Sequence, residues 1–179
     1  MVGLLVLLLL LLAFYQGARR ATALQLFYTV GCLLAFLLAL SRYQEWGKKI
    51  ELYVPYLSVN PETRMAYFSQ QESFDLDKAY YAAVAFIGWF IVGWLFIKFA
   101  MIFAKNLRYR RLLQNDWVVA GVLNTVLMYI VIVMVLKVFT TVPLQAVQNL
   151  FTRSFVADLM VKTPLISNLF DKLWFTNII

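Results

Sequence analysis

The stretch FYQGARRATALQLF, Phe14–Phe27, places two adjacent arginines, Arg19 and Arg20, between long apolar runs. One run, Val2–Tyr15, precedes the arginines, and a second, Ala21–Leu40, follows them. A chain that crosses a bilayer and returns needs a short polar connection, and Lys and Arg gather in connections on the cytoplasmic side. The stretch therefore predicts a tight cytoplasmic turn between two transmembrane helices.

The composition of the whole chain is typical of a membrane protein. Of its 179 residues 63% are hydrophobic and 14% are charged, and the mean hydropathy is +0.77. Soluble domains are about 45–50% apolar and about 25% charged. The net charge of +7 does not indicate nucleic-acid binding, because the cations lie at the ends of apolar runs. Cations at these positions set the topology of the spans and are attracted to anionic lipid headgroups. We expect a lipid bilayer as a partner and no nucleic acid.

Four apolar runs are long enough, or nearly so, to cross a bilayer. A helix rises about 1.5 Å per residue and needs about 20 residues for a hydrocarbon core of about 30 Å. The first run is the shortest, and its cations follow it rather than precede it, which argues against a signal peptide and for a retained helix. The predicted spans are residues 2–18, 21–40, 79–104 and 117–137.

The charges of the connections predict the orientation of these spans. With four spans the first and third connections lie on the same side, and both are rich in cations. The second connection, 41–78, and the tail, 138–179, have mixed charges, so both are expected outside the cytoplasm, together with both termini. The expected cytoplasmic anchors are Arg19, Arg20, Lys105, Arg108, Arg110 and Arg111.

The outer connection and the tail are expected to be ordered. Residues 41–78 contain too many aromatic and aliphatic side chains for a disordered tether, which favours a cap on the outer leaflet. The tail after Pro143 has one apolar face at helical spacing, which indicates an amphipathic helix on the membrane surface or against the bundle. That face comprises Leu144, Val147, Phe151, Phe155 and Leu159. The predicted fold is an all-α membrane domain over 1–179 with four transmembrane helices, a cap and a C-terminal surface helix.

Small residues within the spans predict where helices pack closely, because association in lipid depends on close contact and polar bonds rather than on the hydrophobic effect. The predicted contact positions are Gly31, Ala35 and Ala39 in the second span, and Gly88 and Gly93 in the third.

Three polar side chains within the spans are candidate functional contacts: Gln25, Lys98 and Asn124. Gln25 and Asn124 could be satisfied by another helix. A lysine at the centre of a bilayer costs about 2.5–3.5 kcal/mol on insertion scales, so Lys98 is expected to reach toward the cytoplasmic surface, with an ion pathway as the alternative. All nine carboxylates lie outside the spans, which argues against a proton- or sodium-coupled transporter.

The sequence has few residues suited to catalysis. It contains no histidine and one cysteine, Cys32, so neither an internal disulfide nor a zinc site of the usual His and Cys ligands can form. General acid–base catalysis has little to use. We therefore expect no enzyme and no catalytic, cofactor or metal-binding residue.

Four short motifs follow one another along the chain: YQGARR at 15–20 after the leucine run, VPY at 54–56, DLDKA at 75–79, and TPLIS at 163–167 after Ser154. In this order they resemble the colicin V production protein (CvpA) family of bacterial membrane proteins. The resemblance implies four helices in the bacterial cytoplasmic (inner) membrane, a C-terminus outside the cytoplasm, and a link to toxin production or export and to envelope homeostasis. It implies no chemical activity.

The chain departs from the family pattern at two positions. Ala21 stands where the first turn is expected to have glycine, and Asn124 stands where the fourth span often has glycine. The contact at Asn124 is then either looser or bonded through its amide.

Together these features favour a non-enzymatic accessory or scaffold protein in colicin V-like toxin production or export, or in envelope homeostasis. An envelope protein could bind through residues 41–78 or 144–160. The alternative is a homo-oligomeric pore or channel, in which Gln25, Lys98, Asn124 and the basic third connection would favour anions.

Overall fold

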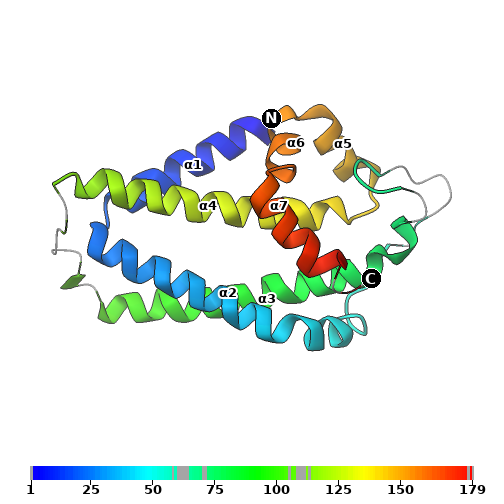
Figure 1. Ribbon diagram of the computed structural model, residues 1–179, viewed down its shortest axis with the longest axis horizontal. Coiled ribbons are helices and arrows are strands. Elements are labelled where there is room, and N and C mark those ends of the chain that lie inside the picture. The colour runs from blue at the N-terminus through cyan, green and yellow to red at the C-terminus, as the bar shows by residue number, and fades with distance from the viewer. Residues whose placement is uncertain are drawn as a thin grey trace. The chain divides into compact units, whose positions relative to one another are not determined.

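The computed structural model describes residues 2–57, 59, 65–69, 72–104, 106–107, 112, 114–176 and 178. Four long helices lead the order of elements: α1 (Val2–Ala18), α2 (Thr22–Ile50), α3 (Leu76–Phe103) and α4 (Asp116–Thr140) (Figure 1). A 3-10 turn, Glu72–Asp75, precedes α3. Three short helices, α5 (Gln145–Arg153), α6 (Phe155–Val161) and α7 (Pro164–Asp171), and a π-helical turn, Lys172–Thr176, follow α4. None of the described residues forms a strand, which confirms the all-α class.

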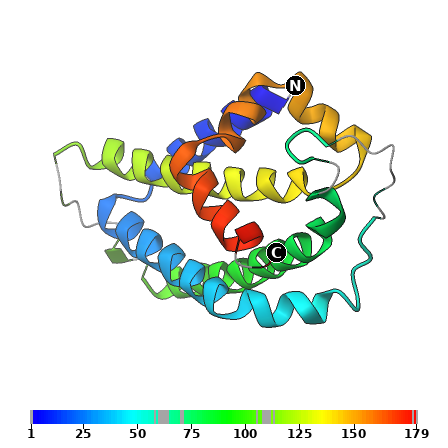
Figure 2. The ribbon, with the colours of Figure 1, turned by 45° about the vertical axis from the view of Figure 1, so that its right-hand side comes forward.

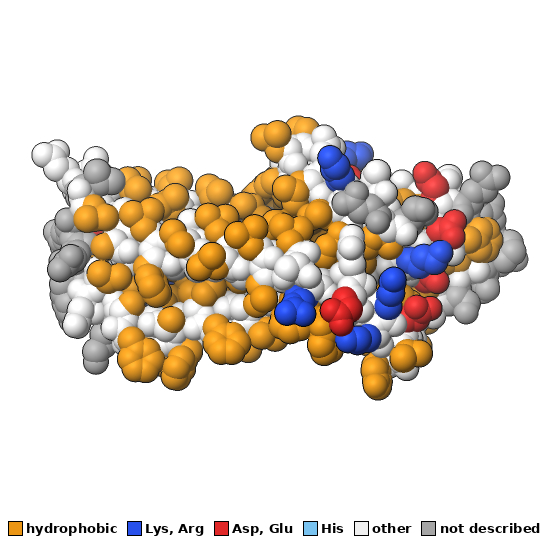
Figure 3. Space-filling model, turned by 60° about the horizontal axis from the view of Figure 1, so that its bottom comes forward, with side chains coloured by type: hydrophobic (Ala, Val, Ile, Leu, Met, Phe, Trp, Pro, Cys, Tyr) orange, Lys and Arg blue, Asp and Glu red, His pale blue; other side chains and the backbone are white. Residues whose placement is uncertain are grey.

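Among the described residues, three helices are long and apolar enough to cross a membrane: α2, α3 with its preceding 3-10 turn, and α4. Helix α1 is apolar but has only 17 residues, so its role as a fourth span stays a prediction. Leucines such as Leu33 and Leu37 on α2 are exposed, as expected for a surface in contact with lipid. Hydrophobic side chains likewise make up most of the coloured side chains on the face in Figure 3.

The contacts within the chain divide it into two compact units. We call Met1–Gly3, Arg42–Ile87 and Ile132–Ile179 the first unit, and Leu4–Ser41 with Gly88–Val131 the second unit.

In the second unit, α1 lies beside α4 and α2 lies beside α3 (Figures 1 and 2). A Cβ added to Gly17 of α1 would lie 2.4 Å from the carbonyl oxygen of Ala120, and one added to Gly121 of α4 would lie 2.7 Å from the ring of Phe14. Backbone and ring approach too closely there for any side chain. Glycine is therefore what lets α1 and α4 touch.

The small face predicted on α2 packs against α3. A Cβ added to Gly93 would lie 2.7 Å from the Cβ of Ala35, and one added to Gly31 would lie 2.7 Å from the side chain of Ile97. Ala39 on the same face is fully buried. Gly88 differs: a Cβ there would meet no atom of the described residues within 4 Å, so a role of Gly88 in helix packing stays a prediction.

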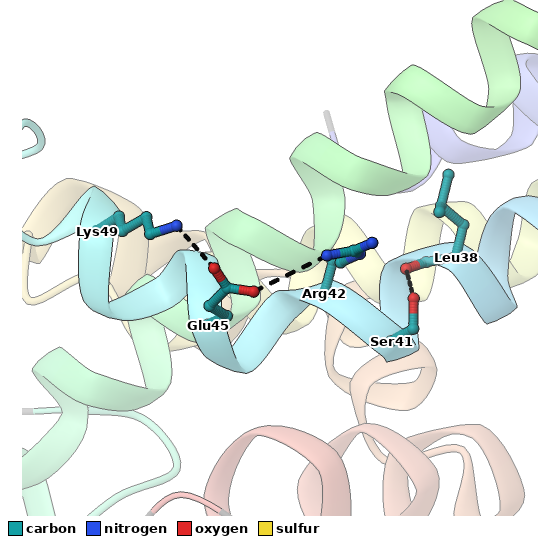
Figure 4. Close-up of polar contacts among 5 residues, drawn as sticks. All are labelled: Leu38, Ser41, Arg42, Glu45 and Lys49. Atoms are coloured by element: carbon teal, nitrogen blue, oxygen red, sulfur yellow. Dashed lines mark hydrogen bonds and ion pairs between the residues drawn. The ribbon is translucent and has the colours of Figure 1, made fainter.

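Helix α2 continues ten residues beyond the span predicted to end at Leu40. In this extension Glu45 pairs with Lys49 at 2.7 Å and with Arg42 at 4.0 Å (Figure 4). Pairs three and four residues apart stabilise an exposed helix, and basic residues near its C-terminus complement the helix dipole. The start of the segment expected to form a loop is therefore helical.

The tail of the first unit forms three short helices instead of the single amphipathic helix predicted. Ser154 has extended backbone angles and caps α6, because its hydroxyl accepts a hydrogen bond from the N–H of Ala157. This break separates the predicted face: Phe151 is 3% exposed, whereas Phe155 is 79% exposed. Phe151 forms a small core with Ala157 and Val161, against which Val2, Tyr67, Leu136 and Val147 pack.

Candidate functional site

A cluster of polar and aromatic side chains lies among the apolar helices of the second unit. We call it the Arg20 cluster, and it consists of Arg20, Gln25, Tyr28, Trp94, Lys98 and Asn124. It brings together all three polar residues that the sequence singled out within the spans.

Hydrogen bonds join Arg20 to the amides of Gln25 and Asn124. Nη1 of Arg20 donates to Oε1 of Gln25 and to Oδ1 of Asn124, each at 3.2 Å. Nε2 of Gln25 donates to Oδ1 of Asn124 at 3.3 Å, and Nδ2 of Asn124 donates to the carbonyl oxygen of Ala13 at 2.6 Å. Asn124 thus bonds α4 to α1, to α2 and to the turn between them. Of the two alternatives left open by the sequence, the amide-bonded contact is the one observed.

Two cations lie at the ring of Tyr28 in the same cluster. The guanidinium carbon of Arg20 is 4.6 Å from the ring centroid, and Nζ of Lys98 is 5.2 Å from it. Lys98 is also 5.0 Å from the ring of Trp94, whose indole N–H donates to the hydroxyl of Tyr28 at 2.8 Å. Aromatic faces attract cations. The two rings therefore orient the Lys98 ammonium within an otherwise apolar helix.

Asp116 fixes the start of α2, a role that the sequence interpretation missed. Oδ2 of this buried carboxylate accepts the N–H of Thr22 at 2.9 Å, and Oδ1 accepts the N–H of Leu112 at 3.0 Å. The hydroxyl of Thr22 donates to the carbonyl oxygen of Asp116 at 3.0 Å. The first N–H groups of a helix have no partner within it. The available signal was a carboxylate directly before an apolar run.

In the first unit, the described part of 41–78 is bonded to the tail. The hydroxyl of Tyr56 donates to the carbonyl oxygen of Thr141 at 2.7 Å, and the N–H of Ala66 donates to Oε1 of Gln148 at 2.9 Å. The same Gln148 side chain donates to the carbonyl oxygens of Thr140, at 3.2 Å, and Val142, at 2.8 Å. The Gln148 side chain thus has two roles: its Nε2 satisfies carbonyl oxygens at and just after the end of α4, and its Oε1 holds the loop at Ala66.

A second bond between loop and tail joins Tyr67 to Asp158. The hydroxyl of Tyr67 donates to Oδ1 of Asp158 at 2.7 Å, and Nζ of Lys162 is 2.9 Å from Oδ2. The hydrogen bond from Lys162, and after it the one from Tyr67, lowers the pKa of Asp158. Burial, and after it the Asp158 carboxylate, raises the pKa of Tyr67. Near neutral pH the tyrosine therefore keeps its proton and the carboxylate its charge.

Exposed apolar side chains mark both segments predicted to bind a partner. Leu52 and Tyr53, next to the end of α2, are 81% and 83% exposed. In the predicted tail segment, 144–160, Phe155 and Leu159 of α6 are exposed; Leu165 of α7, which lies beyond this segment, is 86% exposed. Side chains of this kind could contact either lipid or another protein.

Of the predicted cytoplasmic anchors, the structure describes two. Arg20 belongs to the cluster above, and Arg19 lies over the ring of Tyr15, 5.6 Å from its centroid. The anchors Lys105, Arg108, Arg110 and Arg111 lie outside the described residues. Within the part of the chain that is described, no three His, Cys, Asp or Glu side chains gather as metal ligands.

Comparison with known proteins identifies a family that this chain resembles over most of its length. The family model described as "Colicin V production protein" matches residues 2–164, which is most of the chain. No curated protein and no solved structure matches.

Proposed function

The chain belongs to the colicin V production protein family, and from this premise we propose that it is a non-enzymatic accessory or scaffold protein of the cell envelope. In this proposal it acts in the production or export of a colicin V-like toxin, or in envelope homeostasis. Three helices apolar enough to cross a membrane support a multi-pass membrane protein. The bacterial cytoplasmic membrane, four spans and external termini are part of this proposal.

The observation that carries the proposal is the bonded arrangement of loop and tail in the first unit. Gln148 holds the backbone of Ala66, and Asp158 holds Tyr67, while Tyr53 and Leu165 remain exposed. Ordering a surface before binding lowers the entropy cost of association. An ordered surface with exposed aromatic and aliphatic groups is better suited to binding a protein partner in the envelope than to catalysing a reaction.

Site-specific crosslinking tests this role. A photo-crosslinking residue at position 53 or 165 should capture a distinct envelope protein in cells, whereas one at the lipid-exposed position 33 should not. Tyr53→Asp and Leu165→Asp should reduce both the adduct and toxin export or envelope integrity, with the amount of folded protein unchanged. Adducts only with other copies of the chain, or normal export by both variants, would contradict the role.

The proposed orientation has its own test. In a Cys32→Ser background, Tyr53→Cys should react with a membrane-impermeant maleimide in whole cells, and Arg19→Cys should react only after the membrane is opened. The reverse pattern would overturn the placement of residues 41–78 outside the cytoplasm.

The alternative function, a homo-oligomeric pore or channel, is favoured by the cations Arg20 and Lys98 among apolar helices. It predicts a symmetric oligomer by mass in mild detergent and an anion-selective conductance in planar bilayers. Lys98→Gln should lower that selectivity. A monomer without conductance at high protein density would remove this function and leave the accessory role standing.

A further inference from the structure

The second unit holds two cations at one aromatic ring without a carboxylate to pair with them. Among the described residues, no ion pair joins Arg20 or Lys98 to an acidic side chain. Both side chains are half-buried, and both charges lie at the ring of Tyr28. Like charges repel most strongly where water is scarce, because the effective dielectric constant is low. An aromatic face offsets only part of this repulsion.

The unit's own sequence does not supply a counter-charge. Its two segments, Leu4–Ser41 and Gly88–Val131, contain seven lysines and arginines and one carboxylate, Asp116. Both oxygens of that carboxylate already accept backbone N–H groups, from Thr22 and Leu112. Asp116 therefore acts as a helix cap, and the charges of Arg20 and Lys98 need an anion from elsewhere.

The hydrogen bonds of the cluster leave donors for such an anion. The amide oxygens of Gln25 and Asn124 both accept from Nη1 of Arg20, which fixes the position of the guanidinium group. An arginine has five N–H groups, and those on Nε and Nη2 of Arg20 take no part in these two bonds. The Lys98 ammonium contacts two rings and donates to no acceptor in the described residues.

We propose that Arg20 and Lys98 form a binding site for a phosphate-type oxyanion. A planar guanidinium group matches two oxygens of a phosphate at once, and an ammonium adds a mobile point charge. The depth fits a phosphate at the boundary of a bilayer: Lys98 lies five residues from the end of α3 at Phe103, about 8 Å along the helix. The source of the phosphate is either an anionic lipid headgroup or a free anion.

The experiment measures binding to the purified full-length chain in neutral detergent micelles. Three additives are titrated separately and thermal unfolding is followed: phosphatidylglycerol, phosphatidylcholine and inorganic phosphate. Phosphatidylglycerol should raise the unfolding temperature and phosphatidylcholine should not. If inorganic phosphate acts alike, the ligand is a free oxyanion; if it has no effect, the ligand is a lipid headgroup. This assay needs no partner protein, so its outcome is independent of the accessory role.

Charge variants locate the site. Lys98→Gln should weaken binding at least fivefold and Lys98→Arg should restore it, whereas Lys48→Gln, which removes the same charge on the exposed end of α2, should change it less than twofold. Because Arg20 also holds Gln25 and Asn124, Arg20→Lys is compared with Arg20→Gln to separate charge from folding. The site is refuted if no anion stabilises the parent chain, or if Lys98→Gln and Lys48→Gln bind phosphatidylglycerol equally well.

Discussion

Replacing Ala21 by glycine should stabilise the protein, which is the opposite of the usual effect of glycine. Ala21 has φ of 60°, in the left-handed region, and joins the end of α1 to the start of α2. Its carbonyl oxygen accepts the N–H of Gln25 at 3.0 Å, so its backbone is held by the first turn of α2. A residue with a Cβ pays about 1–2 kcal/mol for this conformation, because the Cβ crowds the following carbonyl oxygen.

The expected gain follows from two opposing quantities. Ala21→Gly removes that crowding, but glycine also gives the unfolded chain more freedom, which costs about 0.4–1 kcal/mol. The difference is a gain of about 1 kcal/mol in the free energy of unfolding. Ala23→Gly, two residues later within α2, is the matched control, because its backbone is helical and nothing is relieved there. It should lose about 0.5–1 kcal/mol.

Both variants can be compared by unfolding the purified protein with increasing SDS in mixed micelles, followed by tryptophan fluorescence. The reasoning stands if the two substitutions shift the midpoint in opposite directions. It is refuted if Ala21→Gly destabilises as much as Ala23→Gly, since residue 21 would then not be left-handed in the folded protein.

Three further perturbations test the remaining contacts. Gly17→Ala should cost about 3 kcal/mol, because its Cβ would overlap backbone atoms of α4, whereas Gly88→Ala, with open space around it, should be neutral or stabilising in the same SDS titration. Gln148→Leu should cost about 3 kcal/mol, because buried carbonyls at the end of α4 lose their donor, and proteolysis should then cut the released loop faster. The lowered pKa of Asp158 means that its contribution is complete above the unfolded pKa of about 3.9 and is lost as the pH falls through the folded value. Acid titration of thermal stability should therefore show a smaller loss below about pH 4 in Tyr67→Phe, which lacks one donor, and equal losses would exclude this bond.

The long helices and the small-residue face of α2 could be predicted because each depends on a local pattern. Twenty consecutive apolar residues dictate a helix in lipid, where every backbone group must be bonded within its own segment. Gly31, Ala35 and Ala39 repeat at four-residue steps and so share one side of α2 in any helix. In the structure this side faces α3, where Ala35 meets Gly93 and Gly31 meets Ile97.

The break in the tail could not be predicted in the same way. The apolar spacing across Phe151 and Phe155 is continuous, so it indicates one helix. The chain instead breaks at Ser154, which lets Phe151 enter a core with Ala157 and Val161 while the serine caps the next helix. Burial against distant residues such as Leu136 outweighed the local pattern.

The candidate site, too, could be predicted from the sequence only in part. Gln25, Lys98 and Asn124 are conspicuous in sequence because polar groups are rare among apolar runs, and their cost in lipid requires partners. Which partners they find depends on residues about a hundred positions apart, such as Arg20 and Asn124, and on which atoms come within hydrogen-bond distance.

What the sequence alone determined is the environment of this protein: its long apolar runs and the cations at their ends indicate a bilayer, since the free energy of transfer into lipid is a sum over residues. What only the tertiary structure decided is the pairing of its few polar groups. Arg20 faces two amides and a tyrosine ring, and Asp116 caps a helix other than its own, because hydrogen bonds depend on the distance and direction between atoms and no one-dimensional pattern encodes them.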